Sequence, residues 1–188
     1  MDENQAIQNI KQHNLRGLTW LVEQYQVKAV RAAYLICRER AQAEDVVQDA
    51  FLDLPDLIQS FDLGRPFEPW FMRVVVNRTL RALSHQRRLV ALPEQEETDT
   101  WLETWIGSPP GPENQLQQTE LEALIWAKMQ LLNPKQRAAV VMRYYLQMSE
   151  QEMAELAAVP AGTIKWRLSA ARRQLRNSLG ADPRKEQL

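Results

Sequence analysis

The sequence predicts an all-α fold with two small helical domains joined by a flexible acidic linker. Apolar residues recur at spacings of three and four through most of the chain, as they do on one face of a helix. Strand signals, meaning β-branched alternation between turn dipeptides, are absent apart from the short run Val74-Val75-Val76. Proline and glycine gather in one polar, acidic stretch, which separates the two helical parts.

Composition excludes several classes of protein. The chain has 188 residues, 45% of them hydrophobic, and a formal net charge of −1, which suits one medium domain or two small ones. One cysteine, Cys37, excludes a disulfide framework and a cysteine-rich zinc site, and two histidines leave little room for another metal site. The first residues lack the features of a signal peptide, and no apolar run is long enough for a membrane span. We therefore expect a cytoplasmic protein with no metal site.

Charge occurs in blocks of alternating sign. Five acids and no base lie between Glu44 and Asp56, and six arginines with one acid lie between Arg65 and Arg88. Eight acids and no base lie between Glu94 and Glu122, and five bases and no acid lie between Gly162 and Arg176. The near-zero net charge therefore hides local patches that favour partners of opposite charge.

The proline-rich acidic stretch sets the domain boundaries, because such a composition cannot bury a core. We predict an N-terminal domain at residues 1–92, a linker at 93–112, a C-terminal domain at 113–180 and a tail at 181–188. Trp101 and Trp105 in the linker can form a short amphipathic turn that docks on another surface.

In the N-terminal domain, two amphipathic helices precede the first basic block. The first carries apolar residues from Leu18 to Tyr25, and the second carries them from Val46 to Leu54. On the second helix, one outward face collects polar and acidic residues with one leucine: Asp45, Gln48, Asp49 and Leu52. Pro55 is expected to kink or end this helix.

The segment from Pro69 to Arg88 predicts a helix with one packed face and one basic face. Pro69 suits the first turn, where its missing N–H costs nothing. The basic face spans about 80° of the helix and consists of Trp70, Arg73, Asn77, Arg81, Ser84 and Arg88. Arginines beside an aromatic ring are typical of a groove for phosphates or single-stranded nucleic acid, although an ordinary solvated helix face has a similar composition.

The segment from Met148 to Arg176 predicts a helix-turn-helix. Ser149 and Glu152 form a capping box that begins the first helix, and the second helix follows the interruption around Pro160. The turn usually requires glycine for its positive φ, and here Ala158 is expected at that position. The exposed face of the second helix carries Lys165, Trp166, Ser169 and Arg173. Such a helix enters the major groove of DNA, although a helical hairpin with a basic surface remains an alternative.

Four segments together resemble the extracytoplasmic-function (ECF) group of bacterial sigma factors. MSEQEMAELAAVPAGTIKWRLSAARRQLR is similar to the promoter-reading helix-turn-helix of that family, and LLNPKQRAAVVMRYY is similar to the segment that leads into it. AEDVVQDAFL resembles the helix that binds the polymerase clamp. SFDLGRPFEPWFMRVVVNRTLRAL resembles the loop and helix that recognise the −10 element. The resemblance covers nearly the whole chain, in the order of the family.

The resemblance implies a non-enzymatic initiation factor without a cofactor. Its expected partners are core RNA polymerase, at the clamp helices and flap, promoter DNA and an anti-sigma factor. The residues implied to bind core polymerase are Asp45, Gln48, Asp49 and Leu52. Those implied to bind the −10 element are Arg65, Phe67, Trp70, Arg73, Asn77 and Arg81. Those implied to bind the −35 element are Arg143, Lys165, Trp166, Ser169 and Arg173.

Several residues depart from the family pattern. Pro55 stands where relatives usually carry an aromatic residue, and Arg81 stands where they often carry an acid. Trp166 replaces a small residue on the reading helix, so the −35 preference of relatives does not transfer. Glu68 in the −10 segment would repel phosphate unless it reads a base amino group.

Two other functions remain open at this point. A DNA-binding regulator that acts without polymerase and dimerises on symmetric sites explains the C-terminal half, but leaves the basic helix and the acidic helix unused. A metal-assisted hydrolase built on Asp45, Asp49 and Asp53 lacks a histidine partner and a phosphate-binding glycine loop.

Overall fold

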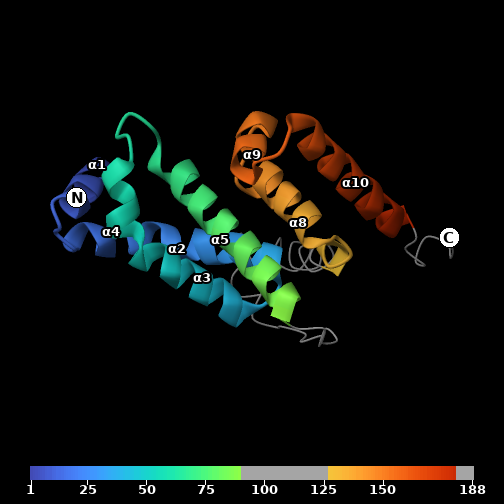
Figure 1. Cartoon of the computed structure of the whole chain (residues 1–188), viewed down its shortest axis with the longest axis horizontal. Helices are drawn as coiled ribbons and strands as arrows, with labels where there is room; N and C mark the ends of the chain where they lie inside the picture. The colour runs from blue at the N-terminus through green and yellow to red at the C-terminus, as the bar shows by residue number, and fades with distance from the viewer. Residues whose placement is uncertain (90–126, 181–188) are drawn as a thin grey trace, which may run out of the picture.

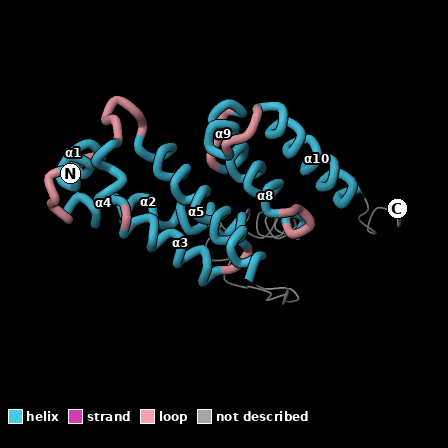
Figure 2. Tube along the Cα trace, viewed as in Figure 1, coloured by secondary structure: helices cyan, strands magenta, loops and turns pink. Residues whose placement is uncertain are grey.

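A computed structural model describes residues 1–89 and 127–180, and every regular element in these two ranges is helical. The helices form an N-terminal and a C-terminal group that lie side by side (Figures 1 and 2). The prediction of an all-α fold is confirmed. The predicted linker at 93–112, with Trp101 and Trp105, and the tail at 181–188 lie outside the described residues.

The N-terminal group packs around a long central helix. Its elements are α1 (Glu3–Lys11), α2 (Arg16–Cys37), α3 (Arg40–Leu52), α4 (Leu54–Leu57) with the 3₁₀ turn Ile58–Ser60, and α5 (Phe67–Leu89). Helix α2 contacts α1, α3 and α5, so it forms the centre of this group. Gly17 allows α1 to approach α2, because a Cβ at this position would lie 2.1 Å from the carbonyl oxygen of Ala6.

Aromatic side chains fill the core beneath α5. The rings of Phe51 and Phe71 lie 4.6 Å apart, and those of Phe67 and Phe71 lie stacked at 5.6 Å. Each of these large apolar rings buries a large area, so together they contribute strongly to the packing of this core. They fix α5 against α2 and α3, so the opposite side of α5 faces outward.

Pro55 ends the α3 helix, as the sequence predicts. Helix α3 stops at Leu52, and Pro55 occupies the first turn of the short helix α4, where a missing N–H costs nothing. The chain therefore changes direction directly after the outward face of α3.

The C-terminal group contains α8 (Pro134–Val140), a π-helical turn (Val141–Tyr145), α9 (Glu150–Ala157) and α10 (Ala161–Gly180). Helix α10 packs on α8 and α9. Ile164, Leu168 and Ala171 provide the buried side of α10.

The two groups share one hydrophobic cluster. Ala32 and Ile36 of α2 and Val76 of α5 pack in the same cluster as the apolar residues of the C-terminal group. Helices α2 and α5 contact α8, and α5 also contacts α9. Helix α10 lies on the far side of α8 and α9, away from α5 (Figure 1).

Candidate nucleic-acid interface

The basic face of α5 is built as the sequence predicts. Met72, Val75, Val76 and Thr79 are buried, and the Thr79 hydroxyl donates to the Val75 carbonyl oxygen. The residues on the opposite face are partly or fully exposed: Trp70, Arg73, Asn77, Arg81 and Ser84. The side chain of Arg88 lies outside the described residues. The indole of Trp70, the guanidinium of Arg73 and the amide of Asn77 follow one another along this face, and such groups bind phosphates and unstacked bases.

Phe67 does not belong to this surface. Its side chain is 0% exposed and contacts the rings of Phe61, Trp70 and Tyr25. The expectation that Phe67 contacts DNA is corrected, because its ring fills the core at the start of α5. Trp70 remains half-buried, with its ring 4.9 Å from that of Phe61. Only part of the indole is therefore free for a base.

The loop before α5 is a compact turn. The Asp62 side chain accepts a hydrogen bond from the Gly64 N–H at 2.9 Å, and it lies 3.7 Å from the exposed Arg65 guanidinium. Glu68 pairs with Lys28 of α2. Because Lys28 offsets this negative charge, Glu68 repels a nearby phosphate less than its sequence position suggests.

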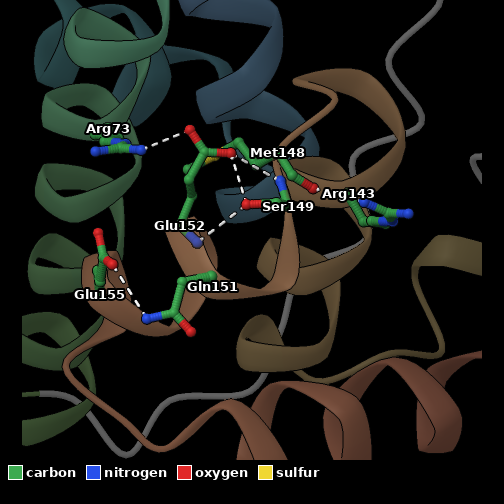
Figure 3. Close-up of polar contacts among 7 residues, drawn as sticks. All are labelled: Arg73, Arg143, Met148, Ser149, Gln151, Glu152 and Glu155. Atoms are coloured by element: carbon green, nitrogen blue, oxygen red, sulfur yellow. Dashed lines mark hydrogen bonds and ion pairs between the residues drawn. The ribbon is translucent and has the colours of Figure 1, made fainter.

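Arg73 forms an ion pair with the other helical group. Its Nη2 lies 2.8 Å from Oε1 of Glu152, which belongs to α9 (Figure 3). The basic face of α5 has no acid of its own that reaches Arg73, yet the C-terminal group supplies one. Sequence reasoning missed this partner, because 79 residues separate the two positions.

Hydrogen bonds at the start of α9 hold Glu152 in place. The Ser149 N–H and hydroxyl donate to Oε2 of Glu152 at 2.9 and 2.8 Å, and the Glu152 N–H donates back to the Ser149 hydroxyl (Figure 3). The predicted capping box is confirmed. Hydrogen bonds from Ser149, assisted by the nearby Arg73, lower the pKa of the Glu152 carboxyl, so this carboxyl is charged at neutral pH.

The turn of the helix-turn-helix has the predicted positive φ. Ala158 adopts the left-handed conformation, with φ 49° and ψ 47°. The Val159 N–H donates to the Ala154 carbonyl oxygen at 3.1 Å, which closes the end of α9. Helix α10 then begins at Ala161, so the prediction of two helices joined by a tight turn is confirmed.

The outward face of α10 carries all four residues predicted on the reading helix. Lys165, Trp166, Ser169 and Arg173 are exposed, and Trp166 leaves 64% of its surface accessible. Lys165 Nζ lies 3.9 Å from a Glu150 carboxylate oxygen, a weak surface pair. Lysine, arginine and serine are side chains that donate to base edges in the major groove.

Arg143 lies before α9 and is exposed. Its Nη1 donates to the Met148 carbonyl oxygen at 3.0 Å, which steadies the segment that enters α9 (Figure 3). One guanidinium edge is therefore engaged within the protein.

The outward face of α3 has the predicted composition. Asp45, Gln48, Asp49 and Leu52 are exposed, and Leu52 leaves 64% of its surface accessible. The opposite face, which consists of Val46, Val47, Ala50 and Phe51, is buried. Acidic side chains gathered on one face favour association with a basic partner, and Leu52 lies beside them.

The carboxylates of Asp45, Asp49 and Asp53, on and just after α3, do not form a metal site. Asp53 pairs with Arg78 of α5, while Asp45 and Asp49 are exposed to solvent. Within residues 1–89 and 127–180, no cluster of three or more His, Cys, Asp or Glu side chains is placed to hold a metal ion. None of the helices in these two ranges is both long and apolar enough to cross a membrane.

Comparison with known proteins accounts for both helical groups. The family model Sigma-70 region 2 matches residues 21–89, and Sigma-70, region 4 matches residues 122–175. The ECF RNA polymerase sigma factor SigW of Bacillus subtilis (strain 168) is 27% identical over 176 residues, which cover 92% of this chain and 94% of SigW. The RNA polymerase sigma factor CarQ of Myxococcus xanthus is 31% identical over 143 residues, which cover 76% of this chain and 78% of CarQ.

Solved structures share the fold over most of the chain. CnrH in complex with the cytosolic domain of CnrY is similar with a TM-score of 0.61 at 21% identity, covering 96% of this chain and 98% of CnrH. The sigma factor RpoE in complex with the anti-sigma factor NepR from Bartonella quintana is similar with a TM-score of 0.59 at 22% identity, covering 85% and 96%. A regulator that acts without polymerase would leave the region 2 match unexplained. This chain belongs to the ECF sigma factors of bacterial RNA polymerase.

Proposed function

We propose that this sigma factor, which directs transcription initiation, binds core polymerase through α3 and promoter DNA through α5 and α10. Sigma factors are non-enzymatic initiation factors, so binding surfaces rather than a catalytic site carry the function. One observation supports the proposal above others: a single chain presents an acidic face with an exposed leucine, a basic helix and a helix-turn-helix on separate elements.

The face of α3 is the proposed site for the polymerase clamp. Asp45, Gln48 and Asp49 offer charge and hydrogen bonds to basic helices, and they steer a basic partner toward this face. Leu52 supplies an apolar contact at the end of the face, where Pro55 turns the chain away. Burying such a side chain contributes about 1.5–3 kcal/mol.

The outward face of α5 is the proposed site for the −10 element. Arg65, Arg73 and Arg81 are suited to phosphates, and Asn77 is suited to the edge of a base. The exposed part of Trp70 gives an unstacked base an aromatic surface, which offsets part of the few kcal/mol that flipping costs. Phe67 is left out, because its ring is buried.

The outward face of α10 is the proposed site for the −35 element. Lys165 and Arg173 donate to guanine edges or phosphates, Ser169 donates to either, and Trp166 offers an apolar surface for a thymine methyl group. Arg143 reaches the DNA from the segment before α9 with the guanidinium edge that Met148 does not occupy.

The partners follow from the family and from the similar structures. Initiation requires two partners. They are core polymerase, bound at its clamp helices and flap, and promoter DNA. An anti-sigma factor is a third, because the similar structures of CnrH and RpoE are complexes with CnrY and with the anti-sigma factor NepR. A cytoplasmic location follows, because the polymerase acts on the chromosome there.

Reconstituted transcription tests the proposal. Purified core polymerase is incubated with a genomic DNA library, with and without this chain, and transcript start sites are sequenced. New start sites that share two upstream elements are expected only when the chain is added. Start sites that do not change on its addition would refute the function.

A matched pair of variants tests the polymerase surface. Leu52→Ser is expected to weaken binding to core polymerase by about tenfold or more, because an apolar contact is lost. Leu15→Ser is the control, since Leu15 is 62% exposed, precedes α2 and is not one of the residues of the α3 face. Equal binding by both variants in a co-purification assay would remove Leu52 from the proposed surface.

A further inference from the structure

A short exposed loop joins the 3₁₀ turn to α5 at the proposed −10 site. It spans residues 61–66 (Figure 1), and every residue from Asp62 to Pro66 is exposed. Phe61 and Phe67 lie on either side of these residues and are buried, with their ring centres 5.8 Å apart. The two rings fix where the loop begins and ends, so the conformation of the exposed residues between them depends on polar contacts.

Lys11, in the last turn of α1, binds the backbone where this loop begins. Its Nζ donates to the Phe61 carbonyl oxygen at 2.7 Å and to the Gln59 carbonyl oxygen at 3.3 Å. Both oxygens lie at the end of the 3₁₀ turn, where carbonyls lack partners within the helix and attract a cation. Because one ammonium group binds two carbonyls, it fixes the direction in which the chain leaves the turn.

Two other helix ends in this chain are held in the same way. Arg137 of α8 is 5% exposed, and its Nε donates to the Ile36 carbonyl oxygen in the last turn of α2 at 2.9 Å. Lys128 Nζ donates to the Ser178 carbonyl oxygen near the end of α10 at 2.8 Å. At each end, a cation from another segment binds carbonyls that the helix leaves unpaired. Lys11 differs in that the backbone it binds leads directly into a proposed DNA-binding loop.

Lys28 of α2 holds the segment where the loop ends. It pairs with Glu68 in the first turn of α5, and the two side chains are only 38% and 40% exposed. Tyr25 lies one turn before Lys28 on α2, and its ring centre is 5.4 Å from that of Phe67. These contacts fix the first turn of α5, which carries Trp70.

The segments that the two lysines hold carry proposed −10 contacts. The ring of Phe61 lies 4.9 Å from that of Trp70, so the residue that Lys11 binds also supports the surface proposed for an unstacked base. Arg65 lies within the loop, and its N–H donates to the Asp62 carbonyl oxygen at 3.0 Å. A loop that already has its bound conformation loses less conformational freedom when it binds.

We infer that Lys11 and Lys28 are positioning residues for recognition of the −10 element, which hold the loop and the first turn of α5 in the conformation that receives a base. The inference rests on the proposed role of Arg65 and Trp70 at that element. Carbonyl oxygens bind the Lys11 ammonium group, and Glu68 binds that of Lys28. Each lysine therefore acts through the group it binds, and neither serves as a phosphate contact.

Affinity for the −10 strand tests this role. Core polymerase is saturated with each variant, and anisotropy measures its affinity for a labelled single strand that carries the −10 element mapped by the transcription assay. Lys11→Met is expected to lower this affinity about three- to tenfold, and Lys11→Arg, which can donate to the same carbonyls, is expected to restore it. Arg16→Met is the matched control, because it removes one positive charge from an exposed residue of the same helical group. It is expected to leave the affinity unchanged.

Two further measurements separate positioning from direct contact with DNA. A phosphate contact contributes about 0.7 to the slope of log affinity against log salt for a single strand, and Lys11→Met is expected to leave this slope unchanged. Lys28→Met is expected to weaken binding in the wild-type chain and to have a smaller effect in a Glu68→Gln background, where its partner charge is gone.

Amide hydrogen exchange on the free chain reports on the loop itself. The N–H groups of Gly64 and Arg65 donate to oxygens of Asp62 at 2.9 and 3.0 Å. Their exchange is expected to be about three- to tenfold faster in Lys11→Met than in Arg16→Met, while the amides of α10 exchange at equal rates in the two variants. The α10 amides thus check that Lys11→Met remains folded.

Three results would overturn the inference: equal −10 affinities of Lys11→Met and Arg16→Met, a salt slope reduced by about 0.7 in Lys11→Met, or equal exchange of the loop amides in both. Lys28→Met is an independent variant, and an equal effect with and without the Glu68 charge would remove Lys28. Start sites that do not change in the transcription assay would refute the proposed function and this inference with it. Changed start sites together with equal −10 affinities would refute this inference alone.

Discussion

The left-handed turn at Ala158 predicts that one substitution has opposite effects at two neighbouring residues. Ala158 has φ 49°, whereas Ala157 is the last residue of α9 and is helical. Glycine adopts a positive φ without steric cost, but it destabilises a helix. Ala158→Gly should therefore stabilise the protein, and Ala157→Gly should destabilise it.

The magnitudes follow from the two conformations. An L-residue in the left-handed region costs about 1–2 kcal/mol, and glycine removes this cost. Glycine also makes the unfolded chain more flexible, which lowers the free energy of unfolding by about 0.4–1 kcal/mol and so offsets part of the gain. The net gain at Ala158 is about 0.5–1 kcal/mol. Ala157→Gly loses about 0.5–1 kcal/mol of helix propensity, and it also removes a methyl group that packs against the hydrophobic cluster shared by the two helical groups.

Thermal unfolding followed by far-ultraviolet circular dichroism measures both effects. A change of 1 kcal/mol moves Tm by about 2–4 °C for a chain of this length, so the two variants, which differ by about 1–2 kcal/mol, should differ by about 2–8 °C in Tm. Urea titrations of the same variants check that the m-value is unchanged, which shows that the denatured state is not the source of the difference. A lower Tm for Ala158→Gly would refute the view that this residue is strained.

Four further predictions concern single residues. Asn77→Ala should weaken promoter melting, read by permanganate reactivity of unpaired thymines, and should leave co-purification with core polymerase intact; an equal loss of both would contradict the assignment of α5. Arg173→Ala should reduce discrimination between the mapped −35 element and a scrambled one by about 1–3 kcal/mol, if this guanidinium makes a bidentate base contact. Replacing thymine by uracil in the −35 element should lower the affinity of the wild-type chain and not of Trp166→Ala, because uracil lacks the methyl group; equal losses would mean that the indole touches no methyl. Burial raises the pKa of the Cys37 thiol to about 11, so its alkylation at pH 8 should be roughly 100-fold slower in the folded chain than at its ordinary pKa, and similar rates in folded and denatured chain would contradict this burial.

Local features of the structure were predictable from the sequence. The Ser149 cap, the turn at Ala158 and the end of α3 before Pro55 each depend on a few neighbouring residues with strong backbone preferences. The two faces of α5 were predictable for the same reason, because one helical period fixes which side chains share a side.

Contacts between distant segments were not predictable in this way. The burial of Phe67 depends on rings from other elements, so its own position at the start of a helix does not show it. The partners of Arg73 and Arg137 come from the other helical group, 79 and 101 residues away. A charge pattern read along one helix does not contain that information.

The buried guanidinium of Arg137 has a practical consequence for anyone who divides this protein into fragments. A fragment that ends after α5 leaves the Ile36 carbonyl without its donor and exposes Ala32, Ile36 and Val76 to water. Because this apolar surface is newly exposed, such a fragment is expected to self-associate or precipitate more readily than the full chain. Replacing Ile36 and Val76 by polar side chains is the remedy that this arrangement suggests for producing the amino-terminal half alone.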